Sequence, residues 1–144
     1  MRQLIRTGVL FIAFAVAYSR PIAAQTSDDF FNPEVLQRIE LWMHGQDWEK
    51  LKAAFQENTY YPADMTWNGV TVYNIGIRSR GLGSRSSTKP GLRVDFDRYN
   101  NGQQFLGLKS FVLDNLTQDR TGIRETAAMR FFTRIGIPGP RETH

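Results

Sequence analysis

The sequence predicts an α+β fold: a mainly antiparallel sheet with two helices on one side. Charged and apolar residues alternate over 92–96, as in a half-buried strand. An Asn-Gly dipeptide at 68–69 favours a two-residue hairpin turn. Near the end of the chain, apolar residues recur every four positions between 123 and 135, as on the buried face of a helix. The resulting order of one strand, one helix, several strands and one helix is typical of α+β sheets.

The first predicted elements are a strand and a helix. Residues 35–43 place apolar side chains at every second position and are predicted as a strand, although Asn32-Pro33 could equally open a helix. Asp47 is a good N-cap for a helix that continues to about Glu57. Its buried face is expected to comprise Trp48, Leu51, Ala54 and Phe55.

The later elements follow from turn signals. Strands at 63–67 and 70–79 flank the Asn-Gly turn, and a second turn at 100–102 leads from the strand at 92–96 to another at 108–113. Thr121 or Asp119 is expected to cap the last helix, and Gly136 to end it. The buried face of this helix is predicted to comprise Ile123, Ala127, Ala128, Phe131, Phe132 and Ile135.

The N-terminus predicts export. Residues 1–24 combine a positive start, a short apolar run and small residues before Gln25, as in a secretory signal peptide cleaved after Ala24. The apolar run is shorter than the roughly 20 residues of a membrane span, so a retained anchor is the weaker alternative. Residues 25–34 are expected to be flexible and 35–144 to fold. The mature protein is predicted to be secreted or in the cell envelope, with no membrane association after cleavage.

Composition excludes several classes of function. The leader holds three of the 18 basic residues and none of the 14 acidic ones, so the mature chain is nearly neutral and unlike a nucleic-acid-binding protein. The chain has no cysteine, so disulfides and thiolate sites are ruled out. With only two histidines, neither near other ligands or a Ser/Asp pair, a zinc site or a Ser-His-Asp hydrolase is not expected.

The segment 76–96, GIRSRGLGSRSSTKPGLRVDF, is the candidate binding site. It has a Gly/Ser loop, and no acid occurs between Asp64 and Asp95. Small residues let backbone N–H groups approach an anion, and Arg and Lys add charge-assisted hydrogen bonds. The alternative is an ordinary solvated hairpin tip. Its five cations are Arg78, Arg80, Arg85, Lys89 and Arg93.

Three other features have both a functional and an ordinary interpretation. Asp95 and Asp97 could bind a divalent ion, or form a solvated face that balances nearby arginines. Glu125 could reach a cation on the sheet, or lie on the helix surface. The sequence at 115–117 is a glycosylation sequon if the source cell glycosylates exported chains. The three tryptophans are expected in the core.

Two longer segments, GIRSRGLGSRSSTKPGLRVDFD and FLGLKSFVLDNLTQDRTGIRETAAMRFFTRIGIPGPR, resemble the N-terminal half of the CotH kinase-like family, named for spore-coat protein H. The resemblance covers roughly residues 35–141. It implies the N-terminal lobe of an atypical protein-kinase-like fold. It also implies transfer of the ATP γ-phosphate to serines of exported or coat proteins, with Mg²⁺ or Mn²⁺.

Residue roles also follow from the resemblance. The loop would cover the phosphates, Lys89 would contact them, and Glu125 would orient Lys89 as the helix glutamate does in kinases. Because Pro90-Gly91 interrupts the strand entry, Arg93 is the fallback cation. The nucleotide-binding residues implied are Arg80, Gly81, Gly83, Ser84, Ser86, Lys89 and Arg93.

One departure from the family concerns length. Family members continue into a second lobe that supplies metal-binding and hydroxyl-positioning aspartates, and no metal ligands are assigned here. The sequence is therefore interpreted as an incomplete CotH-like lobe, inactive as a fragment. The rival interpretation is a non-enzymatic secreted module that binds an anionic polysaccharide or acidic protein through the basic Gly/Ser loop.

Overall fold

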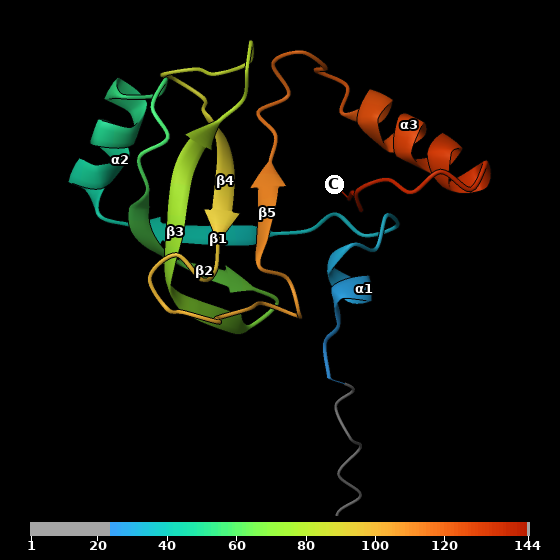
Figure 1. Ribbon diagram of the computed structural model, residues 1–144, viewed down its shortest axis with the longest axis horizontal. Coiled ribbons are helices and arrows are strands. Elements are labelled where there is room, and N and C mark those ends of the chain that lie inside the picture. The colour runs from blue at the N-terminus through green and yellow to red at the C-terminus, as the bar shows by residue number, and fades with distance from the viewer. Residues whose placement is uncertain (1–23, 144) are drawn as a thin grey trace, which may run out of the picture.

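The computed structural model describes residues 24–143, so the predicted signal peptide lies outside the described residues except for Ala24. The described chain is an α+β domain with one five-stranded antiparallel sheet, which confirms the predicted class, and three helices instead of two (Figure 1). None of the helices within 24–143 is both long and apolar enough to cross a bilayer. The elements are α1 (Ser27–Phe30), β1 (Ile39–Met43), α2 (Gly45–Ala53), β2 (Tyr61–Trp67), β3 (Val70–Arg80), β4 (Gly91–Asp95), β5 (Ser110–Leu113) and α3 (Ile123–Arg134).

The sheet is a meander in which every strand pairs with its neighbour in sequence, in the order β1-β2-β3-β4-β5. The sheet is strongly twisted: in Figure 1, β1 runs horizontally, whereas β3, β4 and β5 run vertically. The predicted hairpin turn is confirmed between β2 and β3. Asn68 and Gly69 have φ of 46° and 79°, the left-handed values that a type I′ turn requires at both central positions.

The core lies on one face of the sheet. Strand pairing aligns Ile77 with Val94 and Val94 with Phe111, so apolar residues of neighbouring strands share that face. Trp67 is in this core, but Trp42 is 64% exposed, contrary to the expectation that the tryptophans would be buried. Trp42 alternates onto the opposite face of the edge strand β1.

Residues 25–34, expected to be flexible, contain the four-residue helix α1. Thr26 and Asp29 form a reciprocal capping box, in which Thr26 accepts a hydrogen bond from the Asp29 backbone N–H and Asp29 accepts one from that of Thr26. Phe30 is 2% exposed and packs edge-on against the rings of Trp67, Phe105 and Phe111 at centroid distances of 5.3, 5.4 and 5.3 Å. Phe30 is therefore part of the core, and Phe31 packs against it.

Helix α2 begins earlier than predicted. Its N-cap is His44, whose Nδ1 accepts a hydrogen bond from the Gln46 backbone N–H at 3.3 Å, while the expected cap, Asp47, pairs with Lys50 at 2.9 Å. The helix ends at Ala53, short of the predicted Glu57. Of the predicted buried stripe, Leu51 alone is fully buried, and the helix packs against β2 and β3.

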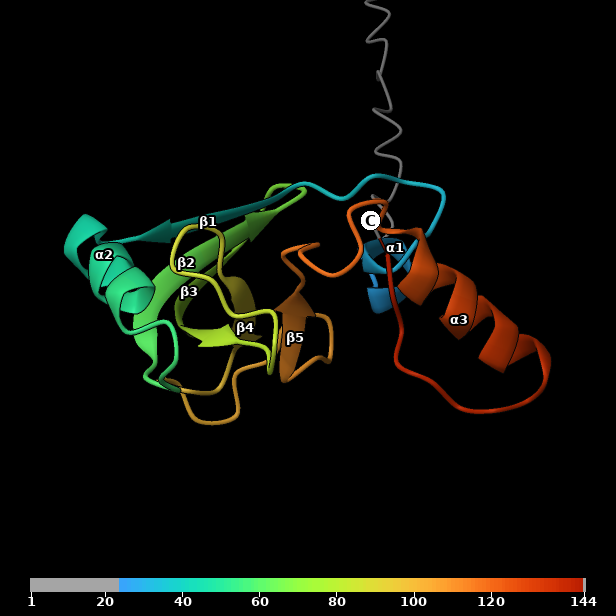
Figure 2. The ribbon, with the colours of Figure 1, turned by 90° about the horizontal axis from the view of Figure 1, so that it is seen from above.

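Helix α3 ends before Gly136 as predicted, but its N-cap is Gly122 instead of Thr121 or Asp119, and its burial differs from the prediction. Asp119 and Thr121 accept hydrogen bonds from the first-turn N–H groups at 2.8 and 3.3 Å, and Gly136 follows the helix with φ of 76°. Its expected core residues Ile123 and Phe131 are 62% and 60% exposed. The helix lies beside α1 and beyond β5 rather than over the sheet, so its apolar stripe does not face the sheet core (Figures 1 and 2).

Candidate anion-binding site

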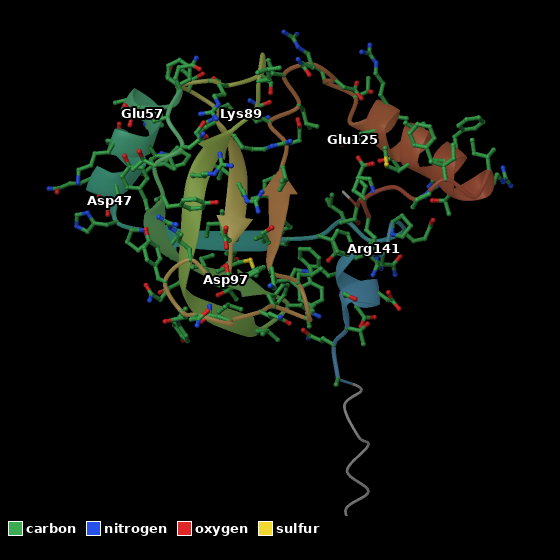
Figure 3. All side chains as sticks on the ribbon, viewed as in Figure 1. Asp47, Glu57, Lys89, Asp97, Glu125 and Arg141 are labelled. Atoms are coloured by element: carbon green, nitrogen blue, oxygen red, sulfur yellow. The ribbon has the colours of Figure 1, made fainter. Side chains whose placement is uncertain are left out.

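The basic loop, defined here as residues 81–90, joins β3 to β4 at one end of the sheet. Arg80 pairs with Gly91 at its base, and Arg78 pairs with Arg93 one step further along the strands. These arginines alternate with the core residues and therefore lie on the opposite, open face of the sheet. Figure 3 shows Lys89 at this end of β3 and β4. The predicted nucleotide-binding residues thus fall into two adjoining groups, the loop and the open sheet face.

Within the basic loop, the Arg85 guanidinium is held by several protein acceptors. Its Nε donates to the Gly81 carbonyl at 2.8 Å, and Nη1 donates to the carbonyls of Phe55 and Glu57 at 3.1 and 2.8 Å. Nη2 donates to the Asn58 side chain at 2.6 Å. The guanidinium therefore ties the loop to the connection between α2 and β2, and four of its five N–H donors are used before any ligand arrives.

Local geometry explains the small residues of the basic loop. Gly81 has φ of 127°, and a Cβ there would lie 2.6 Å from Ser84 Oγ, so only glycine fits without a shift. Ser86 Oγ accepts hydrogen bonds from the backbone N–H groups of Thr88 and Lys89 at 3.2 and 3.1 Å. Ser86 therefore stabilises a local turn. The sequence predicted it only as a nucleotide-binding residue.

Asn115 is a site residue that sequence reasoning missed. It is 4% exposed, and its Nδ2 donates to the carbonyls of Ser84 at 2.7 Å and Lys89 at 2.9 Å. Its Oδ1 accepts from the Thr117 backbone N–H at 3.2 Å. The amide that the sequon would offer to a glycan is thus buried and bonded to the middle and the end of the loop. The available sequence signal was an asparagine two residues after a predicted strand.

Other groups of the loop remain available to a ligand. Lys89 and Arg80 are exposed, and neither side chain has a hydrogen bond or ion pair within residues 24–143. The backbone N–H groups of residues 82–87 likewise donate to no acceptor in the described part of the chain. Consecutive unpaired N–H groups beside cations form an arrangement that binds anions.

The open sheet face carries a compact polar cluster. Arg78 and Arg93 are directly opposite on neighbouring strands, which is unfavourable for like charges without compensation. Asp95 provides part of the compensating negative charge, because its Oδ2 lies 3.9 Å from Arg93 Nε. The same oxygen accepts a hydrogen bond from the Tyr60 hydroxyl at 3.1 Å. The Arg78 guanidinium lies over the Tyr60 ring at 5.5 Å. Asp95, predicted as either a metal ligand or a balancing charge, therefore contacts Arg93 and Tyr60.

The structure does not bring Lys89 and Glu125 together. Glu125 lies on the exposed surface of α3, well apart from Lys89 in Figure 3, and the two form no ion pair in the described chain. Their pairing stays a prediction. The described residues also contain no group of three or more His, Cys, Asp or Glu side chains placed to hold a metal ion.

Fold and site together define an α+β domain with a glycine-containing, cation-rich loop at the end of a curled antiparallel sheet. Residues 77–144 match the family described as CotH kinase protein. The match runs from within β3 through the basic loop to α3 and the end of the chain, and it confirms the resemblance from residue 77 on. The resemblance expected over 35–76 lies outside this match. No curated protein matches the chain.

Proposed function

We propose that this chain forms the nucleotide-binding part of an exported CotH-like kinase that transfers the γ-phosphate of ATP to serines of exported or coat proteins. The observation that carries the proposal is the set of unpaired N–H groups at 82–87 beside two unpaired cations, Arg80 and Lys89. This set lies inside the segment that matches CotH kinase proteins. Phosphate oxygens are the ligands that such a set binds best.

The proposal gives each group of residues a separate task. The N–H groups of the basic loop bind phosphate oxygens, and Lys89 and Arg80 neutralise their charge. The Arg93 side chain is held on the sheet by Ser110 and Asp95. It therefore contributes positive electrostatic potential at the site and no direct phosphate contact. A divalent ion would arrive with the nucleotide, since the described residues do not form a metal site of their own.

Calorimetric titration with ATP and Mg²⁺ tests the proposal. Lys89→Ala should weaken binding about tenfold or more, because a charge-assisted contact is lost. The matched control is Lys109→Ala, which removes an exposed lysine at the far end of β5 and should leave affinity unchanged. Equal affinities of both variants and the parent chain would refute the proposed role of Lys89. A Lys89/Glu125 double-mutant cycle then measures whether the two residues are coupled in the nucleotide-bound form.

The rival function, a non-enzymatic module for an anionic polysaccharide or acidic protein, is favoured by one observation. Arg80 and Lys89 are exposed, as a surface for extended polyanions requires. In that case Arg80 and Lys89 should contribute similarly and additively, and binding should weaken steeply with salt. Arg78 and Arg85 should contribute less, because their donors already have protein partners. Selective binding of ATP over heparin argues against this rival.

Export is part of the proposal, with the leader removed near Ala24 and the product outside the cytoplasm or in the cell envelope. N-terminal sequencing of the protein recovered from its own cell tests this directly. A sequence beginning near Gln25 is expected, and an intact Met1 on a cytoplasmic product would contradict it.

A further inference from the structure

Three backbone carbonyls of the basic loop are held by side-chain donors from Arg85 and Asn115. Arg85 Nε binds the carbonyl of Gly81, and Asn115 Nδ2 binds those of Ser84 and Lys89. The three distances are 2.8, 2.7 and 2.9 Å, all within the normal range for hydrogen bonds. Carbonyl groups are thereby tied to the protein at the start, the middle and the end of the loop.

These bonds determine which backbone dipoles a ligand meets. A carbonyl oxygen carries partial negative charge and repels a phosphate, whereas an N–H group attracts it. With the carbonyls of Gly81, Ser84 and Lys89 occupied, three of the repelling dipoles are bonded to the protein, while the N–H groups of residues 82–87 have no acceptor within 24–143. An anion site formed in advance costs less ordering on binding than a mobile loop does.

We propose that Arg85 and Asn115 are positioning residues that hold the basic loop as a preformed cradle for a phosphate group, with Arg85 acting through its hydrogen bonds and not as an anion ligand. This inference rests on the proposed nucleotide-binding function. It differs from the sequence interpretation, which counted Arg85 among the cations of the site and gave Asn115 no role in the site. Both residues are anchored outside the loop, Arg85 at residues 55–58 and Asn115 after β5.

The substitution Arg85→Lys separates the two roles of Arg85. Lysine keeps the charge but cannot reproduce a fork that reaches Gly81, Phe55, Glu57 and Asn58 together. A positioning role predicts that Arg85→Lys and Arg85→Gln weaken binding of inorganic pyrophosphate and MgATP alike, by about tenfold. A direct charge contact predicts that Arg85→Lys retains affinity, which would overturn the proposal. The control is Arg120→Lys, at an exposed arginine with no side-chain partner in the described structure.

Asn115→Ala tests the second positioning residue, with Asn101→Ala as the matched control at an exposed turn asparagine. We expect Asn115→Ala to lower affinity for MgATP about tenfold while affinity for adenosine changes less than twofold, because only the phosphate cradle is disturbed. An equal loss for adenosine would show general damage and contradict the proposal. Where Asn115→Ala does not fold, Asn115→Ser and the Arg85→Lys result decide.

A ligand-free measurement distinguishes failure of this inference from failure of the proposed function. Backbone ¹⁵N relaxation of residues 81–89 should give order parameters near those of rigid backbone, about 0.8, and values below about 0.6 in Arg85→Lys and Asn115→Ala. Low values in the parent chain would overturn the preformed cradle whatever the ligand. High values in a parent chain that binds neither pyrophosphate nor MgATP would refute the phosphate-binding role while leaving the hydrogen-bonded clamp in place.

Discussion

Phe30→Ala should be one of the most destabilising substitutions in the chain. An aromatic side chain buries roughly 150–250 Å², which at about 25 cal/mol per Å² corresponds to about 4–6 kcal/mol. Alanine retains part of that burial, so we expect a loss of about 3–5 kcal/mol in the free energy of unfolding. Phe30 contacts three core rings and is 2% exposed, so the cavity left behind is enclosed.

Urea unfolding of the mature chain, followed by tryptophan fluorescence, measures this loss as a lower midpoint at constant slope. The control is Leu36→Ala, at a leucine that is 83% exposed, where a change within about 0.5 kcal/mol is expected. If Phe30→Ala costs less than about 1 kcal/mol more than the control, then α1 does not contribute to the core and residues 25–34 are flexible after all.

Two further predictions concern local structure. Gly76→Ala should cost about 1–3 kcal/mol in thermal unfolding, since its Cβ would lie 2.6 Å from Arg98 side-chain atoms and 2.9 Å from the Tyr60 ring. Hydrogen bonds from Thr121 and from the first turn of α3 lower the pKa of Asp119 below its ordinary 3.8. Its stabilisation of α3 is therefore fully present above pH 3.8 and lost as the pH falls through the lowered pKa. Circular dichroism should show a loss of helical signal from the parent chain as the pH falls. The Asp119→Asn variant, which has no carboxylate to protonate at this position, should not show this loss.

The parts of the fold that could be predicted from the sequence are those governed by local chemistry. The hairpin turn at 68–69 and the helix end at Gly136 need left-handed backbone, which Gly and Asn adopt with little strain. The alternation in β4 identified its buried side because one face of a strand repeats every second residue. These features depend on neighbours within a few positions.

Other parts could not be predicted because they depend on distant contacts. The polar composition before Phe30 predicts a flexible segment. Its helix forms where the Phe30 ring packs into the aromatic core, a contact with residues far away in the sequence. Both His44 and Asp47 can accept a capping hydrogen bond, and strand β1 ends so close to α2 that the earlier residue takes the role. The apolar periodicity of α3 predicts an amphipathic helix, but it does not predict which part of the protein packs against the apolar face.

The same division applies to the candidate site. Composition was sufficient to locate the basic loop, because glycine, serine and unbalanced cations occur together there. It could not show that Arg85 is held by acceptors at residues 55–58 and Asn115 by loop carbonyls 26 and 31 positions away. Residue type gives a side chain's chemistry, whereas its available hydrogen-bonding capacity depends on the tertiary structure.

The burial of Asn115 bears on the choice of expression host. Residues 115–117 form an acceptor sequence for N-linked sugar in a eukaryotic secretory pathway. A sugar attached there would occupy the nitrogen that bonds to Ser84 and Lys89, and it has no room in a position that is 4% exposed. Material secreted from yeast or mammalian cells would therefore differ at the loop from bacterial material. Thr117→Ala removes the sequon while keeping Asn115 and the backbone N–H that bonds to it.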